Sequence, residues 1–204
     1  MSGSQEIRSQ IASIQNTQKI TKAMEMVAAS KMKKAQDQMI KARPYADKIS
    51  NVISHLAHAH PEYTSEFFAT REVKKKGYII ISSDRGLCGG LNNNLFKLVV
   101  ETIEEDNKSD IKPAFSLIGS KATSFFQRMG GDVMAQTAQL GDKPQIEQVL
   151  GLIKSTIDSF ISGEIDQVYL VYNKFLNTVS QEPTLQKVLP IQAEDKDDNY
   201  DHYW

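Results

Sequence analysis

The sequence predicts an α/β protein with a long N-terminal coiled-coil helix, and three observations support this fold class. Apolar residues recur in alternating steps of four and three from Ile7 to Leu56. Short apolar runs rich in β-branched residues then alternate with helical segments. The last two apolar runs are separated by a polar loop instead of a helix. Together these patterns predict a Rossmann-like, mostly parallel sheet with an antiparallel edge hairpin.

The first element is a single helix from Ser4, its expected N-cap, to about His58. A 3.5-residue repeat of this length is typical of a left-handed coiled coil. The helix would be roughly 75 Å long, so most of it must project from the body. It should continue past Pro44 with a bend, because the apolar repeat stays in phase there. The seam positions are Ile7, Ile11, Ile14, Gln18, Thr21, Glu25, Ala28, Met32, Ala35, Met39, Ala42, Ala46, Ile49, Ile53 and Leu56.

Three polar residues interrupt this seam, namely Gln18, Thr21 and Glu25. A second apolar stripe, one residue out of step, runs beside the interruption through Ile20, Met24 and Val27. The basic residues nearby are Lys19, Lys22, Lys31, Lys33 and Lys34. Two interpretations remain open: a third body meets the coil here, or the coil contains a local stutter.

The remaining elements follow in the order connector, body and acidic segment. We expect the helix to occupy residues 1–58, the connector 59–76, the α/β body 77–193 and the acidic segment 194–204. Strands alternating with helices predict parallel pairing with right-handed crossovers. The expected strands are 77–83, 114–118, 132–136, 168–175 and 184–191, and the expected helices are 91–104, 120–129 and 145–161.

The composition favours a protein of a reducing compartment with a basic helix and an acidic body. The lone cysteine, Cys88, excludes an internal disulfide, and no apolar run is long enough for a membrane span. Residues 1–56 contain nine basic and four acidic residues, a net charge of +5, whereas the remainder contains fifteen and twenty-one, a net charge of −6. A basic helix suits nucleic acid, an anionic membrane face or an acidic protein surface.

The segment SSDRGLCGGLNNN, at 82–94, is the main candidate for a chemical site. Its glycines suggest phosphate binding at a helix N-terminus, although the spacing fits neither common nucleotide motif. Gly86, Cys88 and Gly90 have the spacing of a nucleophile elbow, but the only later histidine that could serve as base is His202. A tightly packed turn is the alternative. His55, His58 and His60 lie close enough in sequence for a metal site, to which Glu62 could add a carboxylate, and the alternative, which the pattern favours, is a solvated helix end.

Two long motifs resemble one family closely. IRSQIASIQNTQKITKAMEMVAASKMKKAQ, at 7–36, and SSDRGLCGGLN, at 82–92, are similar to the gamma subunit of the bacterial F-type ATP synthase. The resemblance covers essentially the whole chain. It implies a non-catalytic rotor in the central stalk, which couples proton flow through the membrane ring to ATP synthesis or hydrolysis at the beta subunits.

The resemblance also implies partners and contact residues. The expected partners are the alpha and beta subunits, the epsilon subunit and the ring of c subunits, on the cytoplasmic face of the bacterial inner membrane. Lys22, Met24, Arg85 and Lys97 match positions that meet the alpha/beta ring. No catalytic residue, cofactor or metal is expected in this chain, because Mg-nucleotide is bound by the partner subunits.

One departure from the family concerns the partner of the seam. The family's second coil helix would follow Trp204, beyond this sequence. Without it, the seam residues Ile7, Ile11 and Ile14 would be exposed to solvent. We therefore expect the isolated chain to dimerise or aggregate through the seam.

Overall fold

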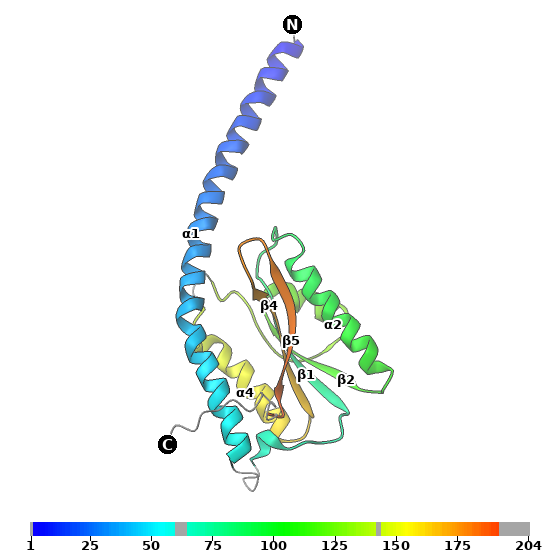
Figure 1. Ribbon diagram of the computed structural model, residues 1–204. Coiled ribbons are helices and arrows are strands. Elements are labelled where there is room, and N and C mark those ends of the chain that lie inside the picture. Colours follow the sequence, from blue (N-terminus) through cyan, green and yellow to red (C-terminus); the bar gives the residue numbers. More distant parts are fainter. Residues whose placement is uncertain (1, 60–64, 142–143, 192–204) are drawn as a thin grey trace. The chain divides into compact units, whose positions relative to one another are not determined.

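The computed structural model describes residues 2–59, 65–141 and 144–191 (Figure 1). The chain divides into two compact units, Met1–Ile53 and Ser54–Trp204. The acidic segment predicted at 194–204 lies outside the described residues.

A single helix, α1, spans Ser2–Ala59. It is continuous through Pro44, so the prediction of one helix instead of two is confirmed. The prediction that Ser4 caps it is wrong, because the helix already begins at Ser2 and the backbone of Ser4 is helical. No helix among the described residues is long and apolar enough to cross a membrane.

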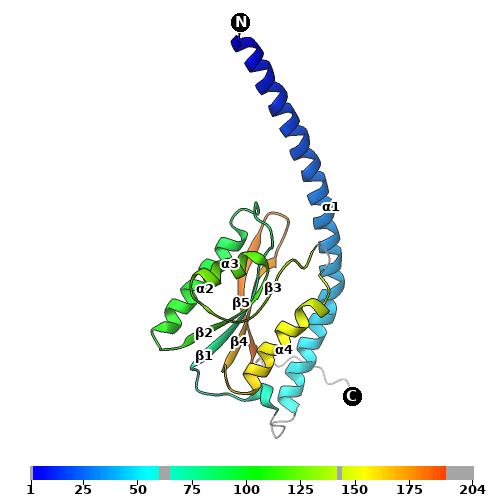
Figure 2. The same cartoon turned by 180° about the vertical axis from the view of Figure 1, so that it is seen from behind.

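The second unit contains a five-stranded sheet in the order β3-β2-β1-β4-β5 (Figures 1 and 2). The first four strands pair in parallel, and β4 and β5 form the antiparallel edge hairpin that the sequence predicts. The strands are β1 Lys75–Ile81, β2 Lys112–Ile118, β3 Asp132–Thr137, β4 Gln167–Phe175 and β5 Gln181–Leu189.

Helices cover both faces of the sheet. One face carries α2, Leu91–Asn107, and α3, Ser120–Arg128, while α4, Glu147–Ile161, lies on the other (Figure 2). Alternate residues of β1 supply the two cores: Tyr78 packs with α2 and α3, and Ile79 packs with α4. Because both faces are buried at the centre of the sheet, β1 and β2 contain continuous apolar runs instead of alternating ones.

Three strands begin at least two residues before the residue that the hydrophobic pattern predicts, and β2 is one of them, because it starts at Lys112 and not at Ala114. β1 begins at Lys75 and not at Gly77, because Lys75 pairs in register with Lys112 and its ammonium contacts Asp132 at 2.8 Å. β5 begins at Gln181 and not at Thr184, although Pro183 lies within it. An edge strand tolerates proline, since one side of its backbone needs no partner in the sheet.

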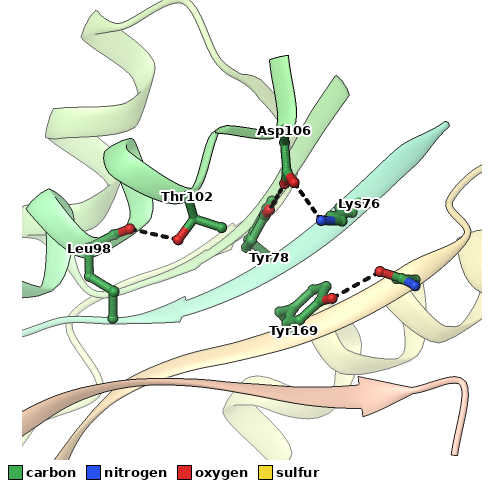
Figure 3. A network of polar contacts seen from close by, with 7 residues as sticks. Lys76, Tyr78, Leu98, Thr102, Asp106 and Tyr169 are labelled. Carbon is green, nitrogen blue, oxygen red and sulfur yellow. Dashed lines mark hydrogen bonds and ion pairs between the residues drawn. The ribbon is translucent and has the colours of Figure 1, made fainter. Parts of the chain in front are cut away.

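A partly buried ion pair joins the start of β1 to the end of α2 (Figure 3). Lys76 Nζ lies 2.5 Å from Asp106 Oδ1, and the Tyr78 hydroxyl donates to Asp106 Oδ2 at 2.6 Å. Burial is the largest cause that raises the pKa of Tyr78, followed by its hydrogen bond to Asp106 and the charge of that carboxylate. This network holds β1 and α2 together at the start of β1, and the loop that follows β1 lies at the other end of the strand.

Candidate functional site

The loop after β1, residues 82–90, occupies the switch point of the sheet. The connection through α2 leads from β1 to β2 on one side, while β4 flanks β1 on the other. In sheets of this kind, surface residues that act on other molecules gather at the carboxyl ends of the strands beside such a point. The candidate loop of the sequence therefore lies where function is expected.

Asp84 fastens this loop to two other segments. Its Oδ1 accepts hydrogen bonds from the backbone N–H of Ser120 at 2.9 Å and from the Ser120 hydroxyl at 3.0 Å. The backbone amide of Gln139 is the largest cause that lowers the pKa of Asp84, and the amides of Ser120 and Leu140 act in the same direction. Asp84 thus places a carboxylate at the N-terminus of α3, where the helix dipole favours negative charge.

The loop also approaches α3 closely through its first residue. The backbone N–H of Ser82 donates to the carbonyl oxygen of Ile118 at 2.8 Å, and the N–H of Ala122 donates to Ser82 Oγ at 2.8 Å. Between them, Gly119 has φ 98°, and a Cβ there would lie 2.3 Å from the Ser82 carbonyl oxygen. Only glycine fits at this junction.

Asn92 holds the interior of the loop from the first turn of α2. This side chain is only 7% exposed; its Oδ1 accepts from the Ser83 N–H at 3.2 Å and its Nδ2 donates to Ser83 Oγ at 2.8 Å. The same Nδ2 lies 3.4 Å from Cys88 Sγ. Ser83 Oγ in turn donates to the Arg85 carbonyl oxygen at 2.6 Å. The loop is therefore rigid and pre-organised.

Cys88 does not occupy a nucleophile elbow. An elbow places its nucleophile directly at the turn between a strand and a helix, often in a strained conformation. Here β1 ends at Ile81 and α2 begins at Leu91, and the positive φ angles belong to Leu87 and Gly89. The hydrogen-bond partners of Cys88 are Ser83 and Asn92, which supports the interpretation as a packed turn. His202 lies outside the described residues.

The metal hypothesis finds no counterpart among the side chains that the structure describes. No group of three or more histidine, cysteine or acidic residues gathers there. The proposed ligands His55, His58, His60 and Glu62 lie outside those described side chains.

The rigid loop displays a basic and an apolar residue side by side. Arg85 is exposed, and Leu87 is fully exposed at 106% of its reference area with φ 62°. A leucine with positive φ is uncommon and costs about 1 kcal/mol or more, which the surrounding hydrogen bonds must offset. Lys97, on the second turn of α2, is 75% exposed and contacts Glu101 at 3.6 Å. Exposed pairs of this kind are weak, so Lys97 is available to a partner.

The other predicted contact residues lie on α1, in the first unit. Lys22 is exposed, and Met24 is 63% exposed. The seam residues Ile7, Ile11 and Ile14 are also exposed, which confirms the expected exposure of this part of the seam. The remaining apolar seam residues with described exposure are exposed or half-buried, namely Ala28, Met32, Ala35, Met39, Ala42, Ala46, Ile49 and Ile53.

The polar interruption of the seam satisfies its hydroxyl groups within the helix. Thr17 Oγ1 donates to the Ser13 carbonyl oxygen at 3.0 Å, and Thr21 Oγ1 donates to that of Thr17 at 2.9 Å. Because these hydroxyl groups donate to the preceding turn, they would keep a hydrogen-bond partner if another surface covered them.

Sequence reasoning missed the residues that brace the loop. Asp84 and Asn92 were not singled out, although an aspartate in a turn and an asparagine at a helix start are common side-chain acceptors. Their partners are distant in sequence, because Ser120 and Gln139 reach Asp84 only in the folded body.

Comparison with known proteins gives one consistent result. A family model described as ATP synthase matches residues 3–203. The ATP synthase gamma chain of Nitrosococcus oceani is 51% identical over 206 residues, which cover 100% of this chain and 71% of the relative. The ATP synthase gamma chain of Pasteurella multocida is 52% identical over 198 residues, which cover 97% and 68%.

The solved structures agree with the sequence relatives. A chain in the cryo-EM structure of the central stalk and c-ring of Tetrahymena thermophila mitochondrial ATP synthase is similar with a TM-score of 0.63. It is 26% identical, and the match covers 84% of this chain and 72% of that one. These matches give no support to a cysteine hydrolase or to a nucleic-acid-binding coiled coil.

Proposed function

This chain belongs to the ATP synthase gamma-chain family, and we propose on this premise that it is the central-stalk rotor subunit of the F1 sector. The observation that carries the proposal is the 51% identity over the whole chain, which includes both the long helix and the α/β body. As a rotor it couples proton flow through the membrane ring to ATP synthesis or hydrolysis, and the catalytic sites lie in the beta subunits.

The physical task of such a subunit is to bias the conformations of other subunits. A helix that turns within a ring of catalytic subunits can favour one state of each in turn, provided that its contacts differ between the states. The protein needs no reactive group for this. It needs a stiff helix, such as α1, and surface groups whose contacts are made and broken without deep burial.

We propose that four residues make those contacts with the alpha/beta ring. Lys22 and Met24 lie beside the polar interruption of the α1 seam, while Arg85 lies on the rigid loop and Lys97 on α2. The three basic groups are exposed, so that an ion pair with an acidic partner gains little but also costs little to break. Weak ion pairs of this kind suit contacts that must form and break in every cycle of rotation.

The domain division follows from the same role. Residues 1–58 would form half of the shaft, 59–76 the connector and 77–193 the foot beside the epsilon subunit and on the c-ring. Residues 194–204 would lead towards the second shaft helix. The subunit would be peripheral at the cytoplasmic face of the bacterial inner membrane, held there through the ring. Mg-nucleotide would be bound by the partner subunits.

Co-expression with the alpha, beta and epsilon subunits tests the proposal. The chain should be retained with them through ion exchange and gel filtration, and it should not bind DNA or RNA in a salt-sensitive manner. The purified chain should show no hydrolase activity, whether or not it carries Cys88→Ala. Failure of the alpha and beta subunits to retain the chain would contradict the rotor assignment, and activity lost with Cys88→Ala would support the hydrolase instead.

A further inference from the structure

The chain that leads from α1 to β1 includes residues 65–74, and we call this segment the strap. It contains a single turn of 3₁₀ helix, η1 Glu66–Phe68, and otherwise lacks regular structure. It belongs to the second compact unit of the chain. Three separate sets of contacts fasten it to the body, at its start, in its second half and at its end.

The start of the strap is fixed by Phe67. This half-buried side chain packs against the buried cluster that contains Phe160, Ile165 and Leu189. The carbonyl oxygen of Phe67 accepts a hydrogen bond from the N–H of Ile191 at 2.8 Å. Because Ile191 follows β5, this bond ties the segment before β1 to the segment after β5.

The second half of the strap is fixed by Arg71, which caps the C-terminus of α4. Its Nη1 donates to the Phe160 carbonyl oxygen at 2.7 Å, and its guanidinium carbon lies 5.2 Å from the centroid of the Phe160 ring. The last carbonyl groups of a helix carry partial negative charge, so they favour a cation. Gly163 leaves room for the arginine, since a Cβ there would lie 3.4 Å from Arg71 Nη1. One side chain therefore binds both the backbone and the ring of Phe160.

The end of the strap is fixed by Asp166, which precedes β4. Its Oδ2 accepts hydrogen bonds from the N–H of Lys74 at 2.8 Å and from the N–H of Lys75 at 2.9 Å. On the other side, the N–H of Lys112 in β2 donates to the Lys74 carbonyl oxygen at 3.0 Å. Residues next to both neighbours of β1 therefore hold the backbone where it enters the sheet.

The contacts of the strap join parts of the body that are far apart in sequence. Arg71 and Phe160 are 89 positions apart, and Lys74 and Asp166 are 92 positions apart. These contacts form only when α4 and β4 are in place. The strap therefore closes onto a folded body, and it can open without unfolding that body.

The order of the contacts along the chain decides what a load on α1 meets first. A load that pulls the chain away from the body from the side of α1 reaches Phe67 first, then Arg71, and the amides held by Asp166 last. Only then would it act on β1. This strand lies at the centre of the sheet, and its residues Tyr78 and Ile80 are fully buried, so its displacement would open the core.

We propose that the strap is a force-bearing anchor between α1 and the body. It takes up load through Phe67 and Arg71, so that β1 stays in the sheet while the load acts. Use of the anchor as a path for torque rests on the proposed rotor function. The anchor itself is a property of this chain and is tested without any partner.

Optical tweezers test the proposal on the purified chain. Handles at Lys48→Cys on α1 and at Lys108→Cys after α2 pull the strap away from the body, and Cys88→Ser in every sample removes the native thiol. At constant force, release of the strap should lengthen the tether by up to about 35 Å, the reach of ten residues. It should precede the much larger lengthening that accompanies loss of β1.

Variants at the strap should change its release specifically. Arg71→Gln should raise the release rate at fixed force about tenfold or more, because a charge-assisted hydrogen bond and a cation–π contact are lost. Phe67→Ala should raise the rate as well. Glu72→Gln is the matched control in the same segment and should stay within about twofold, since Glu72 makes an exposed pair with Lys74. Tyr78→Phe, which weakens the body elsewhere, should also leave the rate unchanged.

Amide hydrogen exchange followed by NMR gives a second readout without applied force. Arg71→Gln should speed exchange of the Ile191 N–H about tenfold, because the strap opens as one unit and releases the bond to Phe67. Glu72→Gln should leave this exchange unchanged. Circular dichroism verifies that each variant is folded, and Arg71→Gln carries the test by itself if Phe67→Ala does not fold.

Three results would overturn the proposal. One is loss of the strap and β1 in a single step in the wild-type chain. Another is a release rate that Arg71→Gln and Glu72→Gln change equally. The third is exchange at Ile191 that does not respond to Arg71→Gln. Retention by the alpha and beta subunits is measured separately, so failure here leaves the rotor assignment unaffected.

Discussion

Asp84 shows how one carboxylate organises the loop after β1, which lacks regular structure. It receives hydrogen bonds from the start of α3 and from the backbone after β3, so that three connections of the body meet at a single side chain. None of these partners is its neighbour in sequence. The precise placement of Arg85 and Leu87 on the surface therefore depends on a residue that makes no proposed contact itself.

Asp84→Asn should lower the free energy of unfolding by about 1 kcal/mol at neutral pH, because it removes the negative charge at the N-terminus of α3 and replaces one of the two oxygens that face the amides of Gln139 and Ser120 by an NH₂ group. The folded protein lowers the pKa of Asp84, so its stabilising contribution is present above the unfolded pKa, near pH 4, and is lost as the pH falls through the folded pKa. Urea unfolding at pH 7 and pH 3 measures this. A stability difference that stays constant between the two pH values would contradict the assignment.

At the scale of elements, the partly buried network at the start of β1 joins strand to helix through Lys76, Tyr78 and Asp106 (Figure 3). Tyr78 is fully buried and its pKa is raised, so the neutral phenol is the form that the folded body accommodates. The neutral phenol of Tyr78 contributes fully to the free energy of unfolding below the unfolded pKa of about 10. This contribution is lost as the pH rises above that value.

Tyr78→Phe should therefore cost about 1 kcal/mol at pH 7, since Asp106 loses one hydrogen bond but keeps Lys76. Above about pH 10 the wild type should lose stability more steeply than the variant, which has no phenol to ionise. Thermal unfolding followed by circular dichroism between pH 7 and pH 11 measures both effects. Tyr172→Phe is the matched control and should keep the steep alkaline loss, because Tyr78 remains.

The exposed seam of α1 leads to a prediction about association of the purified chain. Burial of Ile7, Ile11 and Ile14 against a second copy would remove apolar surface from water, so we expect dimers or larger species in sedimentation. Ile11→Asp should shift the chain towards monomer, whereas Ile40→Asp, the same change at an exposed position off the seam, should not. A monodisperse wild-type monomer with an intact helix by circular dichroism would defeat this prediction.

At the scale of the whole molecule, the exposed cations Arg85 and Lys97 are predicted to act in assembly. Arg85→Glu with Lys97→Glu should weaken retention of the chain by the alpha and beta subunits about three- to tenfold, because two favourable contacts become repulsive. The loss should be largest at low salt. Surface plasmon resonance on the assembled ring measures it, with Lys108→Glu as a control. Unchanged affinity at low salt would remove both residues from the interface.

The sequence predicted more of the fold than of the site. Periodicity identified α1, the parallel strands and the edge hairpin, because each depends on local spacing of apolar residues. It misplaced the start of β1, where the charged Lys75 joins the sheet by pairing with Lys112, and it placed the cap of α1 at Ser4. Pairing between strands that are distant in sequence leaves no local pattern of apolar residues from which it could be predicted.

By itself the sequence determined that this chain consists of a long helix with a heptad repeat and an α/β body, and its long motifs determined the family. Only the tertiary structure decided what the loop SSDRGLCGG is. Contacts from Ser120, Gln139 and Asn92 brace this loop, on which Arg85 and Leu87 are exposed. The physical reason is that hydrophobic spacing is a local property, whereas the hydrogen bonds that rigidify this loop join residues up to dozens of positions apart.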